Sequence, residues 1–170
     1  MPNWCEGTLK VRGAFENVKR WLKECLTVYD FVRKDDENGQ PDFVSVPNAD
    51  KIEFHYFDDE EFDEIEMVIK DDAHIKGTCR HFVRPYDYFV RRRTDESCVA
   101  VLKFKAAWGI VAESFAEMSK EYCVDFRLHG YEMGMEFNQE VIVLKGEVVT
   151  NMETKFDDYE WECPFPLLGG

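Results

Sequence analysis

Apolar and polar residues alternate along several short segments of the chain, and this pattern predicts strands. In residues 4–12, Thr8, Lys10 and Arg12 fall on one side. Leu9 and Val11 fall on the other, as is typical of a strand with one buried face. Further strands are predicted at 51–57, at 79–93 with an interruption at Pro85, and at 98–106, 123–128, 136–144 and 147–152.

Other segments repeat apolar residues at every third or fourth position, which predicts amphipathic helices. Residues 14–26 and 109–122 show this spacing. Residues 58–70 are predicted as a third helix, because acids crowd its start, where they complement the helix dipole. Phe62, Ile65 and Ile69 would form its apolar stripe. Residues 33–50 are rich in turn formers and are predicted as a loop.

The order of these elements predicts an α+β fold. It fits a two-layer sandwich in which helices cover one face of a mostly antiparallel sheet, in the ferredoxin-like (split βαβ) arrangement. We expect one domain over residues 1–155, with the acidic helix at about 58–70 inserted in it. Residues 156–170 would form a C-terminal tail, because prolines exclude helix and central strand at its end.

Composition places the chain among globular proteins of acidic character. The 170 residues are 45% hydrophobic and 15% aromatic, and 35 acids against 21 bases give a net charge of −14. That charge argues against a general binder of nucleic acid or of anionic membranes. No apolar run is long enough to span a bilayer, and the start is unlike a signal peptide. Six cysteines without a CxxC pair then predict reduced thiols in a cytoplasmic protein.

Three short segments resemble a known family. Met1 to Cys5, followed by Thr8 to Gly13, is similar to the PNWC-x-N-x-L-x-I-x-G opening of the YubB-type ferredoxin-like proteins. Ala107-Trp108 resembles the family's AW, and Tyr131 to Phe137 resembles its E-x-G-M-x-F segment. The chain departs from the pattern at Gly7, where the family usually has Asn. The resemblance implies a ferredoxin-like fold and a mobile-element origin (plasmid, phage or integrated element), and it implies no established activity.

The sequence contains no catalytic signature, and we expect a non-enzymatic protein without metal or cofactor. Cys79 and His81 form the closest pair of soft ligands, but a structural zinc site needs four ligands. Cys79 also adjoins the basic Arg80, which could lower the pKa of its thiol. A hydrolase or a metal-dependent enzyme that uses Cys79 and His81 is therefore the least favoured hypothesis. Neither a Gly-rich phosphate loop nor a GxSxG motif is present.

The charges are unevenly distributed along the chain. Residues 58–72 hold nine acids and one base, and residues 153–162 hold five acids and one base. Residues 76–93 hold six bases and one acid, with aromatic residues between them. The average charge therefore does not decide which partner the protein binds.

Three binding hypotheses follow from this distribution. The leading one is a protein-interaction module whose partner is steered by Asp58, Asp59, Glu60, Glu61, Asp63 and Glu64. In the second, the same carboxylates imitate DNA phosphates and antagonise a host defence or restriction protein. In the third, single-stranded nucleic acid binds a face made of Arg84, Tyr86, Tyr88, Arg91, Arg92 and Arg93.

Overall fold

A computed structural model describes residues 3–35, 41–58 and 63–170 and shows a predominantly antiparallel β protein. Of the described residues, 57% lie in strands and 18% in helices. The predicted ferredoxin-like α+β sandwich is therefore wrong. The difference arises because two long segments predicted as helix or loop are in fact strands, and they extend one sheet and build a second.

The larger sheet has nine strands in the order β12-β11-β10-β1-β9-β7-β6-β2-β3. Its central strands β1 (Trp4–Ala14), β9 (Ser97–Ala107) and β10 (Val124–Glu132) confirm three predicted strands. β11 (Phe137–Leu144) and β12 (Glu147–Lys155) confirm the predicted hairpin around Lys145-Gly146. The remaining members are β2 (Leu26–Asp35), β3 (Pro41–Pro47), β6 (Ala73–Ile75) and β7 (His81–Val83).

The smaller sheet has three strands in the order β4-β5-β8. They are β4 (Ile52–Asp58), β5 (Asp63–Ile69) and β8 (Tyr86–Arg91). The helix predicted at 58–70 is wrong over its described part, in which Asp58 ends β4 and Asp63–Ile69 form β5. Ile65, Met67 and Ile69 are buried while the residues between them are not. This is the two-residue period of a strand, and it outweighed the helical spacing of Ile65 and Ile69.

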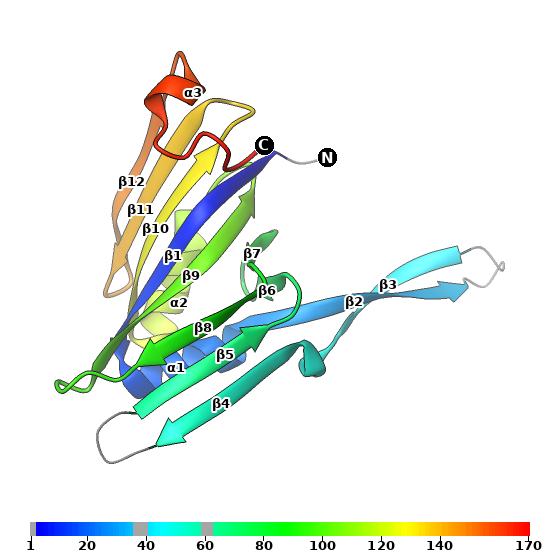
Figure 1. Ribbon diagram of the computed structural model, residues 1–170, viewed down its shortest axis with the longest axis vertical. Coiled ribbons are helices and arrows are strands. Elements are labelled where there is room, and N and C mark those ends of the chain that lie inside the picture. Colours follow the sequence, from blue (N-terminus) through cyan, green and yellow to red (C-terminus); the bar gives the residue numbers. More distant parts are fainter. Residues whose placement is uncertain (1–2, 36–40, 59–62) are drawn as a thin grey trace.

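The predicted loop at 33–50 is also largely wrong. β2 and β3 pair over Tyr29–Asp35 and Pro41–Pro47 into a hairpin, which projects away from the body of the molecule (Figure 1). We call this hairpin the arm. A short 3-10 turn, η1 (Ala49–Lys51), leads from the arm into β4. Prolines at both ends of β3 suit an edge strand, where a missing N–H costs no ladder bond.

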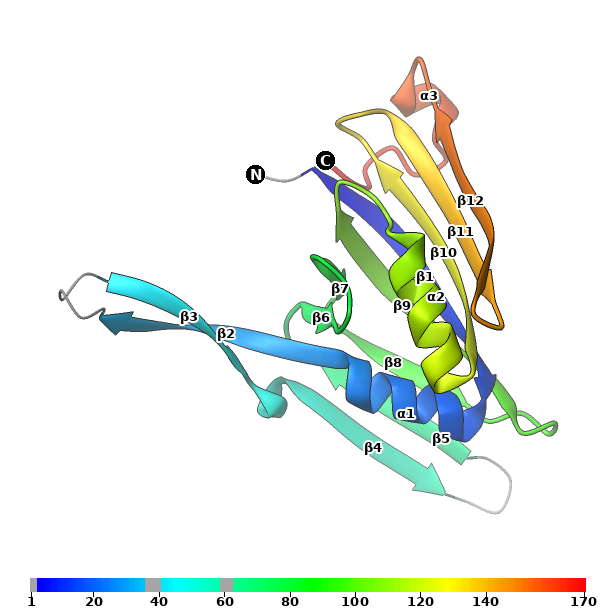
Figure 2. The same ribbon diagram turned by 180° about the vertical axis from the view of Figure 1, so that it is seen from behind.

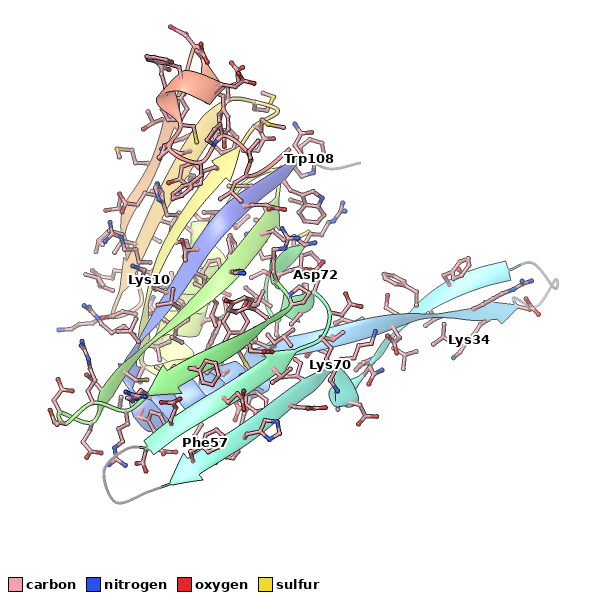
Figure 3. The ribbon with its side chains drawn as sticks, in the orientation of Figure 1. Lys10, Lys34, Phe57, Lys70, Asp72 and Trp108 are labelled. Carbon is pink, nitrogen blue, oxygen red and sulfur yellow. The ribbon has the colours of Figure 1, made fainter. Side chains whose placement is uncertain are left out.

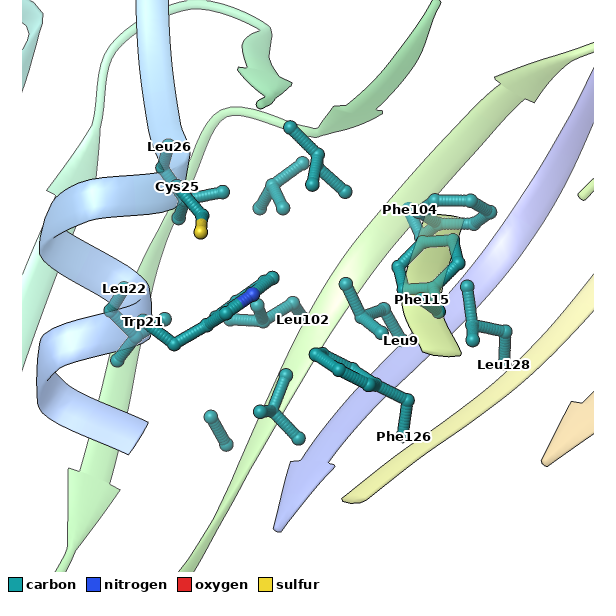
Figure 4. Close-up of a cluster of buried hydrophobic side chains, with 14 of the residues drawn as sticks. Leu9, Trp21, Leu22, Cys25, Leu26, Leu102, Phe104, Phe115, Phe126 and Leu128 are labelled. Atoms are coloured by element: carbon teal, nitrogen blue, oxygen red, sulfur yellow. The ribbon is translucent and has the colours of Figure 1, made fainter. Parts of the chain in front are cut away.

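Two amphipathic helices cover one face of the nine-stranded sheet, as Figure 2 shows. Helix α1 (Phe15–Cys25) and helix α2 (Ala112–Tyr122) confirm the two other predicted helices. Trp21 and Leu22 of α1 meet Leu9, Leu102 and Phe126 of the sheet in a single core (Figure 4). The same core includes Met67 of the small sheet, so both sheets share one hydrophobic interior.

The chain passes from one sheet to the other at Pro85. β7 pairs with β9, and Arg84 N–H still donates to the Lys103 carbonyl at 2.9 Å. After Pro85 the chain leaves β9, and β8 pairs with β5 instead. The predicted interruption at Pro85 is confirmed, and it is the point at which the two sheets diverge.

The C-terminal segment folds back onto the nine-stranded sheet. After the short helix α3 (Tyr159–Glu162), the Phe165 ring lies 5.5 Å from that of Tyr131. Gly170 and Trp4 exchange two backbone hydrogen bonds of 3.0 Å. The segment therefore covers one end of the face opposite the helices (Figure 1). No helix within the described ranges is long and apolar enough to cross a membrane.

Candidate functional site

A cleft of about 580 Å³ lies between the base of the arm and the start of β1. Its walls come from the arm, from the segment leading into β6, from β7 and from the ends of β1 and β9. Short strands β6 and β7 bridge β9 to β2, and this bridge brings the arm opposite Trp4. Four lining residues come from the charged segments 58–72 and 76–93, namely Asp71, Asp72, Arg80 and Phe82. The other lining residues lie outside the charged segments.

A row of four aromatic rings runs along this cleft, across the strands. Tyr29, His74, Phe82 and Trp4 follow one another on β2, β6, β7 and β1. The successive ring centroids are 6.1, 5.5 and 5.9 Å apart. Each contact is edge-to-face, the favoured geometry for aromatic pairs. We call these four residues the ring row.

Cations lie over one end of the ring row. The Lys105 ammonium is 4.7 Å from the Trp4 ring centroid and 5.7 Å from that of Phe82. The Arg80 guanidinium lies 5.8 Å from the Trp4 ring. Arg80 has a left-handed backbone with φ of 59°, which is unusual for a residue other than glycine. These contacts are cation–π interactions, and they keep positive charge beside a partly exposed indole.

The acids of the cleft are already paired with lysines. Lys105 forms an ion pair with Asp72, and Lys51 contacts Asp30 at 2.6 Å and Asp71 at 3.2 Å. Hydrogen bonding to the Lys51 ammonium holds the pKa of Asp30 below its usual value. The cleft is therefore close to neutral, and Arg80 has no carboxylate partner in the part of the chain that the structure describes.

The central strands of the nine-stranded sheet present basic side chains on the face opposite the helices. The outward positions of β1, β9 and β10 carry two acids, Glu6 and Asp125, and five bases: Lys10, Arg12, Lys103, Lys105 and Arg127. We call these five residues the basic strip. A polar depression of about 180 Å³ lies within it, lined by Thr8, Lys10, Arg127 and His129. Figure 3 shows Lys10 in the middle of this face.

The six residues predicted to form a nucleic-acid face do not form one surface. Tyr88 is buried at 4% exposure, whereas Tyr86 is half exposed. Burial raises the pKa of Tyr88 to about 12, and its hydroxyl donates to the Arg84 carbonyl at 2.7 Å. Arg93 is exposed. The other arginines are held by carboxylates: Arg84 by Glu6, Arg91 by Glu64, and Arg92 by Asp63 and Glu96.

The predicted partner-binding acids are only partly within the described residues. Asp59, Glu60 and Glu61 lie outside them, and Asp58 ends β4. Asp63 and Glu64 lie on β5, where they pair with Arg92 and Arg91. These two carboxylates therefore neutralise two arginines of the basic segment that follows them in sequence. The regular carboxylate rows that DNA mimicry requires do not appear in this part of β5.

No family model, curated protein or solved structure matches this chain. The resemblance to YubB-type proteins therefore stays a prediction.

The segments that carry the resemblance nevertheless meet at one end of the nine-stranded sheet. The Asn3 carbonyl accepts the Trp108 N–H at 2.9 Å. The buried Glu132 carboxylate accepts the N–H groups of Gly134 and Met135, at 2.9 and 2.5 Å. A Cβ on Gly134 would lie 2.5 Å from the Asn3 amide nitrogen. The contacts observed for these residues are structural ones.

Cys79 and His81 do not converge on a metal or catalytic site. Cys79 is exposed, whereas the His81 ring is buried between Phe104 and Phe115. The His81 ring carries its proton on Nδ1, which donates to the Cys79 carbonyl at 2.8 Å, and Nε2 accepts the Val111 N–H at 3.1 Å. Burial lowers the pKa of His81. Within the described residues, no group of three metal-binding side chains comes together.

Sequence reasoning missed both the ring row and the arm. Each ring of the row comes from a different strand, and the four residues are up to 78 positions apart in sequence, so no local motif predicts the row. The arm did leave a signal. Phe43, Val44 and Val46 lie between two prolines, and this short apolar run is typical of a strand.

Proposed function

We propose that this protein is a non-enzymatic interaction module that binds a protein partner through the arm. The observation that carries the proposal is the exposure of large apolar side chains on a hairpin projecting from the body. Phe31 is 75% exposed and Phe43 is 64% exposed. Tyr29, Val32 and Val46 are also exposed on the same hairpin. A cluster of exposed apolar side chains is a common mark of a protein-binding site.

The arm also offers an unpaired strand edge. β3 is the last strand of the nine-stranded sheet, and in the described residues it pairs only with β2. Between its terminal prolines it carries one charge, Asp42. An edge strand of this kind lacks the lysines that normally discourage pairing. It is suited to accept a strand from a partner, with backbone hydrogen bonds and with apolar side chains on both faces.

Charge favours a basic partner over a second copy of the chain. Two copies with a net charge of −14 each repel one another at long range. The outward face of the small sheet, near the base of the arm, carries Glu53, Glu64, Glu66 and Asp87 with one arginine, Arg91. This field would steer a basic protein toward the arm, in agreement with the leading sequence hypothesis.

Site-specific photo-cross-linking in cells that make the full chain tests this proposal. A photoreactive phenylalanine analogue replaces Phe43 on β3. The matched control replaces Met152, which is 55% exposed on β12, the strand at the opposite edge of the same sheet. We expect nuclease-resistant adducts with a basic protein from position 43 and severalfold fewer from position 152. Val46→Lys, which faces Asp30 across the arm, should reduce the yield while keeping the hairpin paired.

Equal yields at the two edges would overturn the proposal. Adducts that contain only a second copy of this chain, or that disappear on nuclease treatment, would also overturn it.

A further inference from the structure

The face of the nine-stranded sheet opposite α1 and α2 is open over its middle. Both helices lie on the other face, and the C-terminal segment reaches only the end near Tyr131 (Figures 1 and 2). Lys10, Arg12, Lys103 and Arg127 are accordingly exposed on this face. They belong to a surface distinct from the edge of the arm, and they are the groups that a ligand would meet.

Ion pairing within the protein accounts for only part of the basic strip on this face. The chain has 35 acids and 21 bases, so carboxylates are abundant. Even so, Lys10 and Lys103 have no carboxylate partner among the residues described. The Lys103 ammonium instead lies 3.6 Å from the Tyr86 ring centroid. Lys105 pairs with Asp72, Arg12 with Asp125 and Arg127 with Glu140. The two arginines are each 60% exposed, and ion pairs of exposed side chains contribute little to stability.

Two members of the basic strip oppose one another directly. Lys10 and Arg127 are register partners on β1 and β10. Like charges at directly opposed positions destabilise a sheet. Thr8 and His129, the next outward pair, complete the depression of about 180 Å³. The four side chains place an ammonium, a guanidinium, a hydroxyl and an imidazole around one hollow, a set of donors that suits a phosphate group.

The ring row continues this surface on the same face. Phe82 is the register partner of Lys105, and His74 is the partner of Phe82. Lys105 therefore joins the basic strip to the rings. From β10 to β2 the sheet order contains six strands, which span about 24 Å at the usual spacing between strands. Cations and stacking surfaces thus follow one another across the whole span.

We propose that the open face binds single-stranded nucleic acid. The basic strip holds backbone phosphates, and unstacked bases pack against the rings in the cleft. Single strands are favoured over duplexes because bases reach aromatic side chains only when they are unpaired. The contacts are with backbone charge and ring faces, so binding depends little on sequence.

The net charge of −14 does not exclude this partner, because the charges are separated in space. The acids of the small sheet lie on a different surface, and the outward positions of β1, β9 and β10 carry five bases against two acids. A ligand beside Lys10 and Lys103 therefore meets positive charge that no carboxylate of the described residues pairs with. The association constant should fall as salt rises. A plot of its logarithm against the logarithm of the salt concentration should have a slope of about −0.7 for each phosphate contacted.

Fluorescence anisotropy with a labelled oligonucleotide of about 12 thymidines measures this affinity in the full chain. A duplex of the same length and heparin, as competitor, are the comparison ligands. Lys10→Glu with Lys103→Glu should weaken oligonucleotide binding at least tenfold. Lys34→Glu with Lys76→Glu is the matched control. It reverses the charge at two exposed lysines outside the basic strip and makes the same change in net charge. It should weaken oligonucleotide binding much less than the strip variant does.

A ring variant separates nucleic acid from other polyanions. Tyr29 is partly exposed at the end of the ring row. Tyr29→Ser should weaken oligonucleotide binding at least fivefold and leave heparin binding unchanged, because heparin has no bases to stack. Circular dichroism of each variant confirms that the sheet is retained.

Three outcomes would overturn the proposal. The first is equal weakening by the strip variant and its control. The second is binding that Tyr29→Ser leaves intact, which would identify a site for polyanions in general. The third is tighter binding of the duplex than of the single strand. The two tests remain distinguishable because the cross-linking test reads protein adducts at position 43 that survive nuclease, whereas these outcomes are measured with purified protein and oligonucleotide alone.

Discussion

The central strands of the nine-stranded sheet and the three-stranded sheet have outward faces of opposite charge. In the nine-stranded sheet, the outward positions of β1, β9 and β10 hold five bases and two acids. In the three-stranded sheet, the outward positions hold four acids and one arginine, Arg91. Both sheets are antiparallel and bury their other face in one shared core. The difference in charge therefore comes from side-chain choice at outward positions and not from fold.

Charge counted along the sequence does not give the charge of a surface in this protein. The segment 76–93 is basic, but β8 within it pairs with the acidic β5, and Arg91 and Arg92 are neutralised there. The basic strip draws instead on strands whose own sequences are not notably basic. Local charge at a surface is set by which strands become neighbours.

The largest effect should come from the core that the two sheets share. Leu102→Ala in β9 and Met67→Ala in β5 each remove a fully buried side chain. We expect losses of about 3–5 and about 2–4 kcal/mol in the free energy of unfolding. Because both residues belong to one core, urea unfolding followed by circular dichroism should show one transition in each variant.

The matched control for this pair is Val101→Ala. Val101 precedes Leu102 but points outward and is half exposed, so its loss should change stability by no more than about 0.5 kcal/mol. A separate transition at lower urea concentration in Met67→Ala alone would show that the small sheet unfolds independently of the nine-stranded sheet. The two sheets would then not share one cooperative core.

A smaller effect should come from His81, near the point where the sheets diverge. Its Nε2 accepts the Val111 N–H, so His81→Phe leaves that donor unsatisfied. We expect a loss of about 1–3 kcal/mol at neutral pH. Because burial lowers the pKa of His81, the neutral ring stabilises the fold above the ordinary histidine pKa of about 6.5. This contribution is lost as the pH falls below that value toward the lowered pKa.

Chemical unfolding between about pH 7 and about pH 5 measures this dependence. The wild-type slope should be larger than that of His81→Phe. Val101→Ala, which changes an exposed side chain and no titratable group, is the control and should keep the wild-type slope. Parallel pH profiles for wild type and His81→Phe would contradict the assignment.

The smallest effect should come from the ion pair between Arg84 and Glu6. It joins the residue just before Pro85 to the open face of β1, at 2.7 Å. Arg84 is 42% exposed, so a double-mutant cycle with Arg84→Ala and Glu6→Ala should give a coupling of about 0.2–1 kcal/mol. The coupling should decrease as salt is raised. A coupling energy that does not change with salt would indicate that the two side chains interact by packing and not by their charges.

Much of the fold could be predicted where hydrophobic periodicity was unambiguous. Helix α1, helix α2 and the central strands β1 and β9 follow their patterns closely. β5 was missed because acids at the start of 58–70 resemble a helix start, while Ile65, Met67 and Ile69 alternate as in a strand. β3 was missed because prolines and turn formers around it indicate a loop. Both errors replaced strands by other structure, and together they produced the wrong fold class.

The candidate sites were less predictable than the elements. Trp4 and Phe82 were visible as aromatic residues, but their contact at 5.9 Å requires β7 to pair with β9 beside β1. Lys10 and Arg127 are 117 positions apart and become register partners only through the β1–β10 ladder. The hydrophobic periodicity of a strand predicts which of its residues are buried, but it does not predict which distant strand it pairs with.

The sequence by itself determined the amphipathic helices, the central strands, the break at Pro85 and the excess of acid. These follow from local periodicity, from the fixed φ of proline and from composition. The tertiary structure alone decided which arginines are neutralised, where the rings align and which strand edge is left unpaired. Those properties depend on strand order and register, which are set by the burial of one shared core and not by any single segment.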